Sequence, residues 1–290
     1  MPVAIAVGDL VIRKSHGGDI VFKVMDICEQ GQYEPSCVLK GLHMRLLADA
    51  PLDDVERVDA EHLRVEIKRL EEKRSDCLSR VMERRSADRM PNLWRGDRKK
   101  YSYFDIPGRV LHIDGDEEYL KMCLKTYRQL NLEADGEWIS EANQPEQIVA
   151  VVKKYRPDIL VITGHDALSG NGKKDCRNIE NYRNSKHFVQ SVLNVRSLCP
   201  SRDELVIFAG ACQSYFEAII AAGANFASSP TRIFIHAYDP VFIAEKVAFT
   251  SINQAINLSD TITSSVTGVE GVGGIETRGK FRLGLPKTPY

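Results

Sequence analysis

From residue 108 onward, the chain alternates short, continuous apolar runs with longer amphipathic stretches. The runs at 110–114, 158–163, 205–209 and 232–237 are too short for typical helices, and each is followed closely by Gly or by Asp-Pro. Runs of this kind are typical of parallel strands that are buried on both faces, and the amphipathic stretches are typical of helices that cover such a sheet. The pattern therefore predicts a doubly wound, mostly parallel α/β sheet within residues 106–290.

The amphipathic stretches predict the helices of this sheet. We expect one after the first strand, with Leu120, Cys123, Tyr127 and Leu130 on one side, and others at 145–155, around 188–195, at 213–222 and at 241–258. The stretch 267–285 is rich in Gly, and we expect it to be irregular.

The first 55 residues have a different pattern. Short β-rich runs lie at 10–13, 20–25 and 37–42, and Gly17-Gly18 separates the first two, which indicates a hairpin. We expect residues 1–55 to form a small β-barrel of the SH3 or Tudor type, with a docking or regulatory role.

Residues 56–105 connect the two parts. Apolar residues at helical spacing predict a charged helix over 62–86 with a narrow apolar stripe; they are Leu63, Ile67, Leu70, Cys77 and Val81. Basic residues then crowd 84–100, which we interpret as a solvated, protease-accessible linker and not as a nucleic-acid patch.

Composition and the spacing of cysteines argue against several classes of protein. Because 39 Lys and Arg residues balance 40 Asp and Glu residues, we expect no nucleic-acid partner. No apolar run is long enough to span a membrane and no signal peptide is evident, so we expect a cytoplasmic protein. The 7 Cys residues are scattered without a CxxC pair, which argues against a disulfide framework and a zinc ribbon. We expect no metal and no cofactor, and the sequence sets no oligomeric state.

Polar residues follow several of the predicted strands. In open α/β sheets the ligand site lies at the carboxyl ends of the strands, so the candidates are Asp114, Asp116, His165, Asp166, Cys212 and residues 236–239. His165 lies 47 residues before Cys212, and each follows an apolar run. This spacing is close to that of the His and Cys residues in the caspase signature.

Cys212 and His165 suit nucleophilic catalysis. With a helix expected from Gln213, unpaired N–H groups and the helix dipole favour the thiolate of Cys212 and offer an oxyanion donor. Gly210 and Ala211 leave room for a substrate carbonyl, and His165 takes the thiol proton and returns it to the leaving amine. The alternative interpretation is that Cys212 is a small buried apolar residue and His165 a hydrogen-bonded loop residue.

Other interpretations have less support. His112 and His236 lie within apolar runs and are expected to be core residues. The acidic cluster 114–118 is similar to that of phospho-receiver domains, but His165 follows the next predicted strand where a receiver needs Asp. A receiver-like or scaffold α/β domain without protease activity, which recruits partners through the N-terminal barrel, stays as the alternative function. The chain contains no GxSxG and no HExxH motif.

With these residues placed, the whole chain resembles the YabG family of sporulation-specific cysteine proteases. The resemblance rests on 8–11, 158–168, 208–214 and the Gly-rich tail through 278–282. It implies a caspase-like core, a Cys212/His165 dyad and no metal. It also implies action in the mother cell on proteins of spore coat and cortex assembly, with association with the forming spore.

The resemblance further implies cleavage after Arg. In the gingipain-like branch of this clan the acid that binds Arg comes from the end of the first strand, where this chain has Asp114 and Asp116. Caspases have Gly directly after the catalytic His, whereas here Gly164 precedes His165 and Asp166 follows it. We expect Gly164, Asp166, Gly210 and Ala211 to lie near the oxyanion site, and the Arg-rich linker from Arg84 to Arg98 to be a region of self-cleavage.

Overall fold

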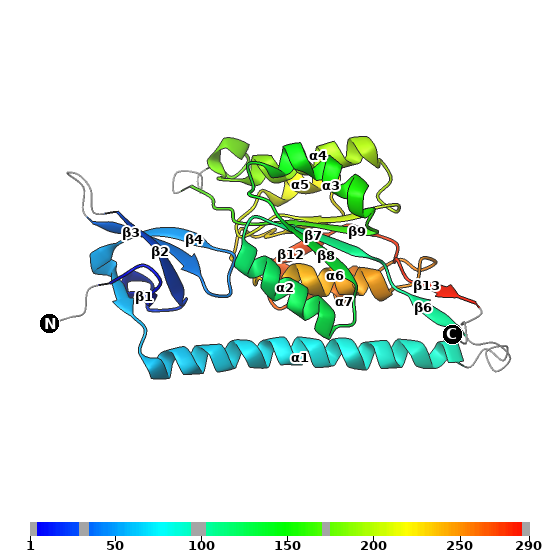
Figure 1. Cartoon of the computed structure of the whole chain (residues 1–290), viewed down its shortest axis with the longest axis horizontal. Coiled ribbons are helices and arrows are strands. Elements are labelled where there is room, and N and C mark those ends of the chain that lie inside the picture. Colours follow the sequence, from blue (N-terminus) through cyan, green and yellow to red (C-terminus); the bar gives the residue numbers. More distant parts are fainter. Residues whose placement is uncertain (1–4, 29–34, 94–102, 170–174, 286–290) are drawn as a thin grey trace. The chain divides into compact units, whose positions relative to one another are not determined.

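The computed structural model describes residues 5–28, 35–93, 103–169 and 175–285, with side chains given for all of these except 87–93 (Figure 1). The chain divides into two compact units, Met1–Arg74 and Ser75–Tyr290. The division falls within helix α1 (Ala60–Leu93). No helix in the described ranges has a stretch that is long and apolar enough to cross a membrane.

The first unit contains an antiparallel sheet with the strand order β4-β3-β2-β1-β5. Its strands are β1 (Leu10–Arg13), β2 (Phe22–Cys28), β3 (Ser36–Gly41), β4 (Leu47–Pro51) and β5 (Val55–Arg57). The predicted hairpin is confirmed, because β1 pairs with β2 in antiparallel fashion. Gly17 and Gly18 both have positive φ in this connection, a conformation that glycine adopts without strain.

The second unit contains a six-stranded sheet with the order β12-β11-β10-β9-β7-β8. Its strands are β7 (Val110–Asp114), β8 (Ala134–Trp138), β9 (Ile159–Thr163), β10 (Val206–Ala209), β11 (Phe226–Ser228) and β12 (Val272–Gly274). All neighbours pair in parallel except β11 and β12, which are antiparallel. The prediction of a mostly parallel α/β sheet is confirmed.

Helices cover both faces of this sheet (Figure 1). Those on one face are α3 (Gln144–Tyr155), α4 (Ser185–Leu198) and α5 (Phe216–Ala221), and those on the other are α2 (Glu117–Gln129), α6 (Asp239–Phe249) and α7 (Leu258–Thr263). Successive strand residues point to opposite layers, so Leu160 packs into the first layer and Val161 into the second. This two-sided burial explains why the strands are continuous apolar runs.

The predicted charged helix is confirmed and extends beyond 86 as α1. Cys77 and Val81 belong to the apolar core that also contains α2 and α6. Arg84 and Arg85 lie on α1 and pair with the buried Glu245 of α6, so the first part of the predicted linker is packed helix. Beyond the linker, β6 (Phe104–Ile106) forms a two-stranded sheet with β13 (Arg282–Gly284).

The strand predicted at 232–237 is wrong. The sheet position next to β10 is taken by β11, which lies earlier in the chain. Residues 232–237 instead run across the loop that contains Cys212. Ile233 accepts a hydrogen bond from the backbone of Gln213, and Ile235 donates one to the sulfur of Cys212, so their backbone groups serve this loop and not a sheet.

Two predicted helices have different bounds. The helix expected from Gln213 begins only at Phe216, because the chain first makes a turn in which the Ala211 N–H donates to Ser214 Oγ. The helix expected over 241–258 ends at Phe249, after which Thr250 accepts a hydrogen bond from the backbone of Phe281.

The Gly-rich tail, expected to be irregular, contributes the edge strand β12. A side chain at Gly273 would collide with the ring of Phe216, and one at Gly274 would collide with Phe226. The glycines therefore allow this backbone to approach the sheet closely, and a Gly-rich composition conceals a strand here.

Asp239 at the start of α6 offers a prediction of pH dependence. It is fully buried and accepts hydrogen bonds from the backbone N–H groups of His236, Val266 and Thr267. Burial raises the pKa of Asp239 from 3.8 to about 6, against the opposing effect of these hydrogen bonds. Because the pKa of Asp239 is higher in the folded than in the unfolded protein, binding of a proton to Asp239 stabilises the fold. This stabilisation is fully present below the unfolded pKa of 3.8 and is lost as the pH rises through 6.

Asp239→Asn carries no titrating group at this position. Its free energy of unfolding relative to wild type is expected to rise by about 2 to 3 kcal/mol between pH 4 and pH 7. Urea denaturation of both proteins across this range measures the difference, and a difference that does not vary with pH contradicts the prediction.

Candidate active site

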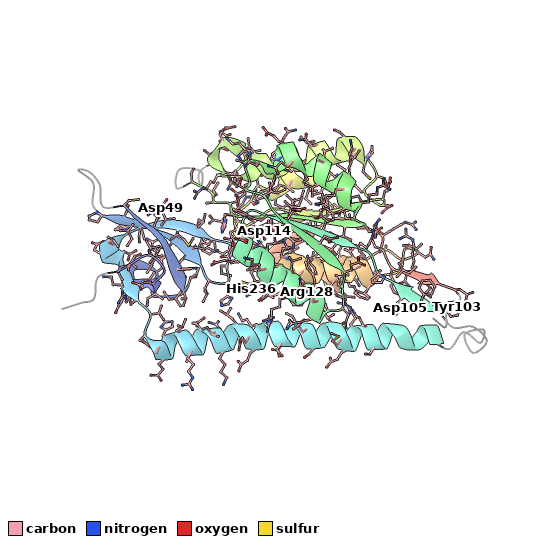
Figure 2. All side chains as sticks on the ribbon, in the orientation of Figure 1. Asp49, Tyr103, Asp105, Asp114, Arg128 and His236 are labelled. Carbon is pink, nitrogen blue, oxygen red and sulfur yellow. The ribbon has the colours of Figure 1, made fainter. Side chains whose placement is uncertain are left out.

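The predicted site residues lie at the carboxyl edge of the second unit's sheet. Asp114 ends β7, His165 follows β9 and Cys212 follows β10. Because β9 pairs in parallel with both β7 and β10, these three strand ends are adjacent. Figure 2 shows Asp114 where β7 leads into α2. The fold thus brings to one edge the residues that the sequence placed after separate strands.

Cys212 lies in a turn and is fully buried. Its Sγ accepts a hydrogen bond from the backbone N–H of Ile235 at 3.2 Å and lies 3.7 Å from the carbonyl oxygen of the same residue. The sulfur thus both accepts from and donates to the backbone of Ile235. Because α5 begins only at Phe216, the helix that the sequence analysis expected from Gln213 does not start directly beside Cys212.

His165 lies between two carboxylates. Its Nε2 is 3.4 Å from Asp116 Oδ2, and its Nδ1 is 3.4 Å from Glu141 Oε1. The backbone N–H of His165 donates to the same Glu141 oxygen at 2.6 Å, and its carbonyl accepts from Asn184 Nδ2 at 2.8 Å. Within the described part of the chain, Nε2 makes no hydrogen bond.

Glu141 was not a candidate from the sequence. It follows β8, a strand that the sequence analysis missed because Ala134–Trp138 contains Asp, Gly and Glu and lacks an apolar run. Because candidates were sought only at the carboxyl ends of predicted strands, and β8 was not predicted, Glu141 was not considered. The only signal was the Trp138-Ile139 pair just before it.

Asp166 links the loop of His165 to the loop of Cys212. Its carboxylate is buried and accepts hydrogen bonds from Ser185 Oγ and from Ser214 Oγ, the latter at 3.0 Å. Ser214 Oγ in turn accepts from the Ala211 N–H at 2.9 Å. Burial raises the pKa of Asp166, against the opposing effect of the hydrogen bonds it accepts. The residue after His165 is thus joined through one hydroxyl to the residue before Cys212.

The residues expected near the oxyanion site lie at this edge. The Gly210 N–H donates to the carbonyl of Ile162, and the Ala211 N–H donates to Ser214 Oγ, so both groups already serve the fold. Gly210 has a φ of 111°, a conformation that glycine adopts readily. Gly164 has a different role, because a side chain there would collide with the carboxylate of Glu141.

The two acidic candidates for an arginine pocket have different surroundings. Asp114 is fully buried; its Oδ2 accepts a hydrogen bond from Thr163 Oγ1 at 3.0 Å and lies 3.4 Å from His112 Nε2. Asp116 is 9% exposed, and its Oδ1 accepts from the Tyr119 N–H at the start of α2. Of the two carboxylates, that of Asp116 lies beside His165.

The remaining histidine candidates are buried, as expected. His112 is fully buried, with Nε2 2.8 Å from Thr163 Oγ1 and Nδ1 3.2 Å from Tyr127 Oη. His236 is 3% exposed. Within the described ranges, no group of three or more His, Cys, Asp or Glu side chains is arranged to hold a metal ion.

The fold and this edge define an α/β protein with a thiol and an imidazole on neighbouring strand ends. The family model described as YabG peptidase U57 matches residues 6–286, and the chain therefore belongs to this family of peptidases. It is also 41% identical over 292 residues to the sporulation-specific protease YabG of Bacillus subtilis (strain 168), with 97% of each chain covered. The family resemblance seen in the sequence motifs is confirmed, and the chain is a sporulation-associated peptidase.

Proposed function

We propose that this peptidase is a cysteine endopeptidase with Cys212 as the nucleophile and His165 as the general base and acid. The observation that carries the proposal is that the two residues end neighbouring parallel strands, with Asp166 bridging their loops through Ser214. A thiol and an imidazole at one edge, with a hydrogen-bonded link between their loops, support this assignment, and the family supplies the class of reaction.

In the proposed reaction, His165 takes the proton from Cys212 Sγ as the sulfur forms a bond to the carbonyl carbon of the scissile peptide. The tetrahedral intermediate collapses, the C–N bond breaks, and the imidazolium gives its proton to the leaving amine. Water then attacks the thioester while His165 takes one of its protons. The C–S bond breaks, the acid product leaves, and the proton returns to the sulfur.

Access to the thiol requires a rearrangement. Cys212 is fully buried, and Ile235 contacts its sulfur through both backbone polar groups. The substrate carbonyl has to occupy the space beside this sulfur. We therefore place the segment around Ile235 among the parts that shift when a substrate binds.

We assign the preference for Arg before the cleaved bond to Asp116 and not to Asp114. A guanidinium needs a carboxylate when it enters a partly desolvated pocket, because an unpaired buried charge costs several kcal/mol. Asp114 is fully buried and engaged with Thr163, whereas Asp116 lies beside His165.

Cleavage of fluorogenic peptides that end in Arg, Lys, Asp or Leu tests the function. We expect release from the Arg peptide alone, insensitive to EDTA. Asp116→Asn is expected to lower kcat/KM for the Arg peptide by about 10- to 100-fold, since a charge-assisted pair to the substrate is lost. Asp114→Asn serves as the neighbouring control. An Asp116→Asn enzyme with full activity on Arg peptides contradicts the pocket assignment, and equal release from all four peptides contradicts the preference.

We also propose the domain organisation, the substrates, the location and a region of self-cleavage. We propose a caspase-like catalytic domain over 106–290, preceded by an SH3- or Tudor-like barrel over 1–55 and a connection over 56–105. The substrates we propose are spore coat and cortex-assembly proteins, with the enzyme in the mother cell and associated with the forming coat. Arg84 and Arg85 pair with Glu245. We therefore place self-cleavage at Arg95 or Arg98, which lie outside the described residues, and intact-mass analysis of the same incubations tests it.

A further inference from the structure

We infer that Glu141 is the positioning residue of the active site: it holds the His165 ring through Nδ1 and leaves Nε2 to exchange the proton with Cys212. The inference rests on the proposed function and adds a third residue to the dyad. It is carried by the contacts of Glu141, by the space built for its carboxylate and by its charge.

Glu141 contacts His165 at both its main chain and its ring. Oε1 of Glu141 accepts the backbone N–H of His165 at 2.6 Å and lies 3.4 Å from Nδ1 of the same residue. Because one carboxylate oxygen contacts both the main chain and the ring of His165, it limits rotation about the side-chain torsions of His165. Asn184 holds the carbonyl of His165 from the other side. His165 is therefore held by neighbours that belong to different loops.

Glycines after two strands leave space for this carboxylate. A Cβ atom at Gly115, after β7, or at Gly164, after β9, would collide with the carboxylate of Glu141. Both positions therefore need glycine for Glu141 to reach His165. This also gives Gly164 a reason to precede His165 that does not depend on an oxyanion donor.

The charge of Glu141 suits the role. Burial raises the pKa of Glu141, but hydrogen bonds from the ring and backbone of His165 outweigh that effect, and the net pKa is lowered. The carboxylate is thus ionised at neutral pH. Its side chain is 14% exposed, so water screens its attraction for an imidazolium only weakly.

The two carboxylates beside His165 then have separate tasks. Glu141 faces Nδ1, so Nδ1 keeps its proton and Nε2 accepts the proton from Sγ; Glu141 itself takes up no proton. Asp116 faces Nε2, and the proposed function assigns it to the Arg side chain of the substrate. Loss of Glu141 should therefore lower kcat on every substrate, while loss of Asp116 should act on the Arg substrate.

The test compares kinetics of wild type, Glu141→Gln, Glu141→Asp and Gly164→Ala on an Arg peptide across pH 5 to 10. Glu137→Gln is the matched control, because Glu137 is an acid of the neighbouring β8 that pairs with Lys154 and Tyr155 away from the edge. We expect Glu141→Gln to lower kcat by about 10- to 100-fold with little change in KM. The acidic limb of its pH profile, where the imidazolium loses its proton and becomes the base that the proposed reaction needs, should move to lower pH by about one unit, because the carboxylate that stabilises the imidazolium is lost.

Glu141→Asp keeps the charge, and we expect it to retain more activity and an acidic limb nearer to that of wild type. Gly164→Ala displaces the carboxylate without removing it and should match Glu141→Gln. If wild type is active and Glu141→Gln has the same pH profile as wild type, the proposed role of Glu141 is wrong. The proposal of a Cys212/His165 dyad is not affected by that result. If wild-type activity survives Cys212→Ala, the proposed function itself fails. If Glu141→Gln does not fold, Gly164→Ala and Glu141→Asp decide the question by the same limb.

Discussion

Cys212→Ala is expected to lower kcat/KM for an Arg peptide by at least about 1,000-fold while the protein stays folded. The thiol is the only group at this edge to which we assign bond formation with the substrate, so no other side chain replaces it. Loss of one buried sulfur atom at a strand end leaves a small cavity, for which we expect a cost of about 1 kcal/mol. Peptide cleavage and thermal unfolding of the same preparation measure the two effects.

Cys37→Ala is the matched control for this variant. Cys37 is also buried, and its Sγ donates to the carbonyl of Ala50, but it lies in the N-terminal unit. It should lose a similar amount of stability and no activity. Alkylation with iodoacetamide alone is less decisive, because Cys28 and Cys176 are exposed and Cys212 is not. Residual turnover of Cys212→Ala above about 1% of wild type would assign the nucleophile elsewhere.

The edge of the sheet that carries the site was predictable from the sequence. β7, β9 and β10 are buried on both faces, so they are continuous apolar runs, and the residues that follow them stand out. Cys212 and His165 were singled out as candidates in this way. The order of the strands was not predictable, since it depends on which helices cross over between them.

The parts that the sequence did not reveal share a physical cause. β8 is an edge strand of mixed polarity, so neither it nor Glu141 beyond it was seen. β12 contains glycines that bring its backbone against Phe226, which in the sequence suggests a loop. The opposite error occurred at 232–237, where apolar residues are buried over Cys212 and not within the sheet. Apolar composition reports burial, and the pairing partner of a buried segment is set by tertiary structure.

The same distinction applies to the basic residues at the end of α1. By composition Arg84 and Arg85 belong to a solvated linker, yet both pair with Glu245, which is 0% exposed. Arg85 Nη1 also donates to the carbonyl of Leu130 at 2.6 Å, and its guanidinium lies 3.3 Å from the ring centre of Phe249. These contacts join α1 to α6 and to the end of α2 within the second unit.

Glu245→Gln is therefore expected to lower the free energy of unfolding by about 3 to 5 kcal/mol. The substitution keeps the shape of the side chain but leaves two partly buried guanidinium groups without their carboxylate. Glu117→Gln on α2 is the control, because Glu117 forms an exposed ion pair with Lys121 and should change stability by less than about 0.5 kcal/mol. Urea denaturation of both variants measures the difference.

A second variant separates charge from packing at this contact. Glu245→Met removes the carboxylate and fills its volume with an apolar side chain, but it also leaves the guanidinium groups of Arg84 and Arg85 unpaired. The triple variant with Arg84→Met and Arg85→Met removes all three charges and should recover much of the lost stability, since a buried ion pair is worth little more than well-packed apolar residues. If the triple variant is as unstable as Glu245→Gln, the contact acts through packing of the arginine stems and not through the buried charge. If Glu245→Gln lowers the free energy of unfolding by no more than Glu117→Gln does, the contact of the end of α1 with Glu245 contributes nothing to stability. The end of α1 would then behave as the solvated linker that its composition suggested.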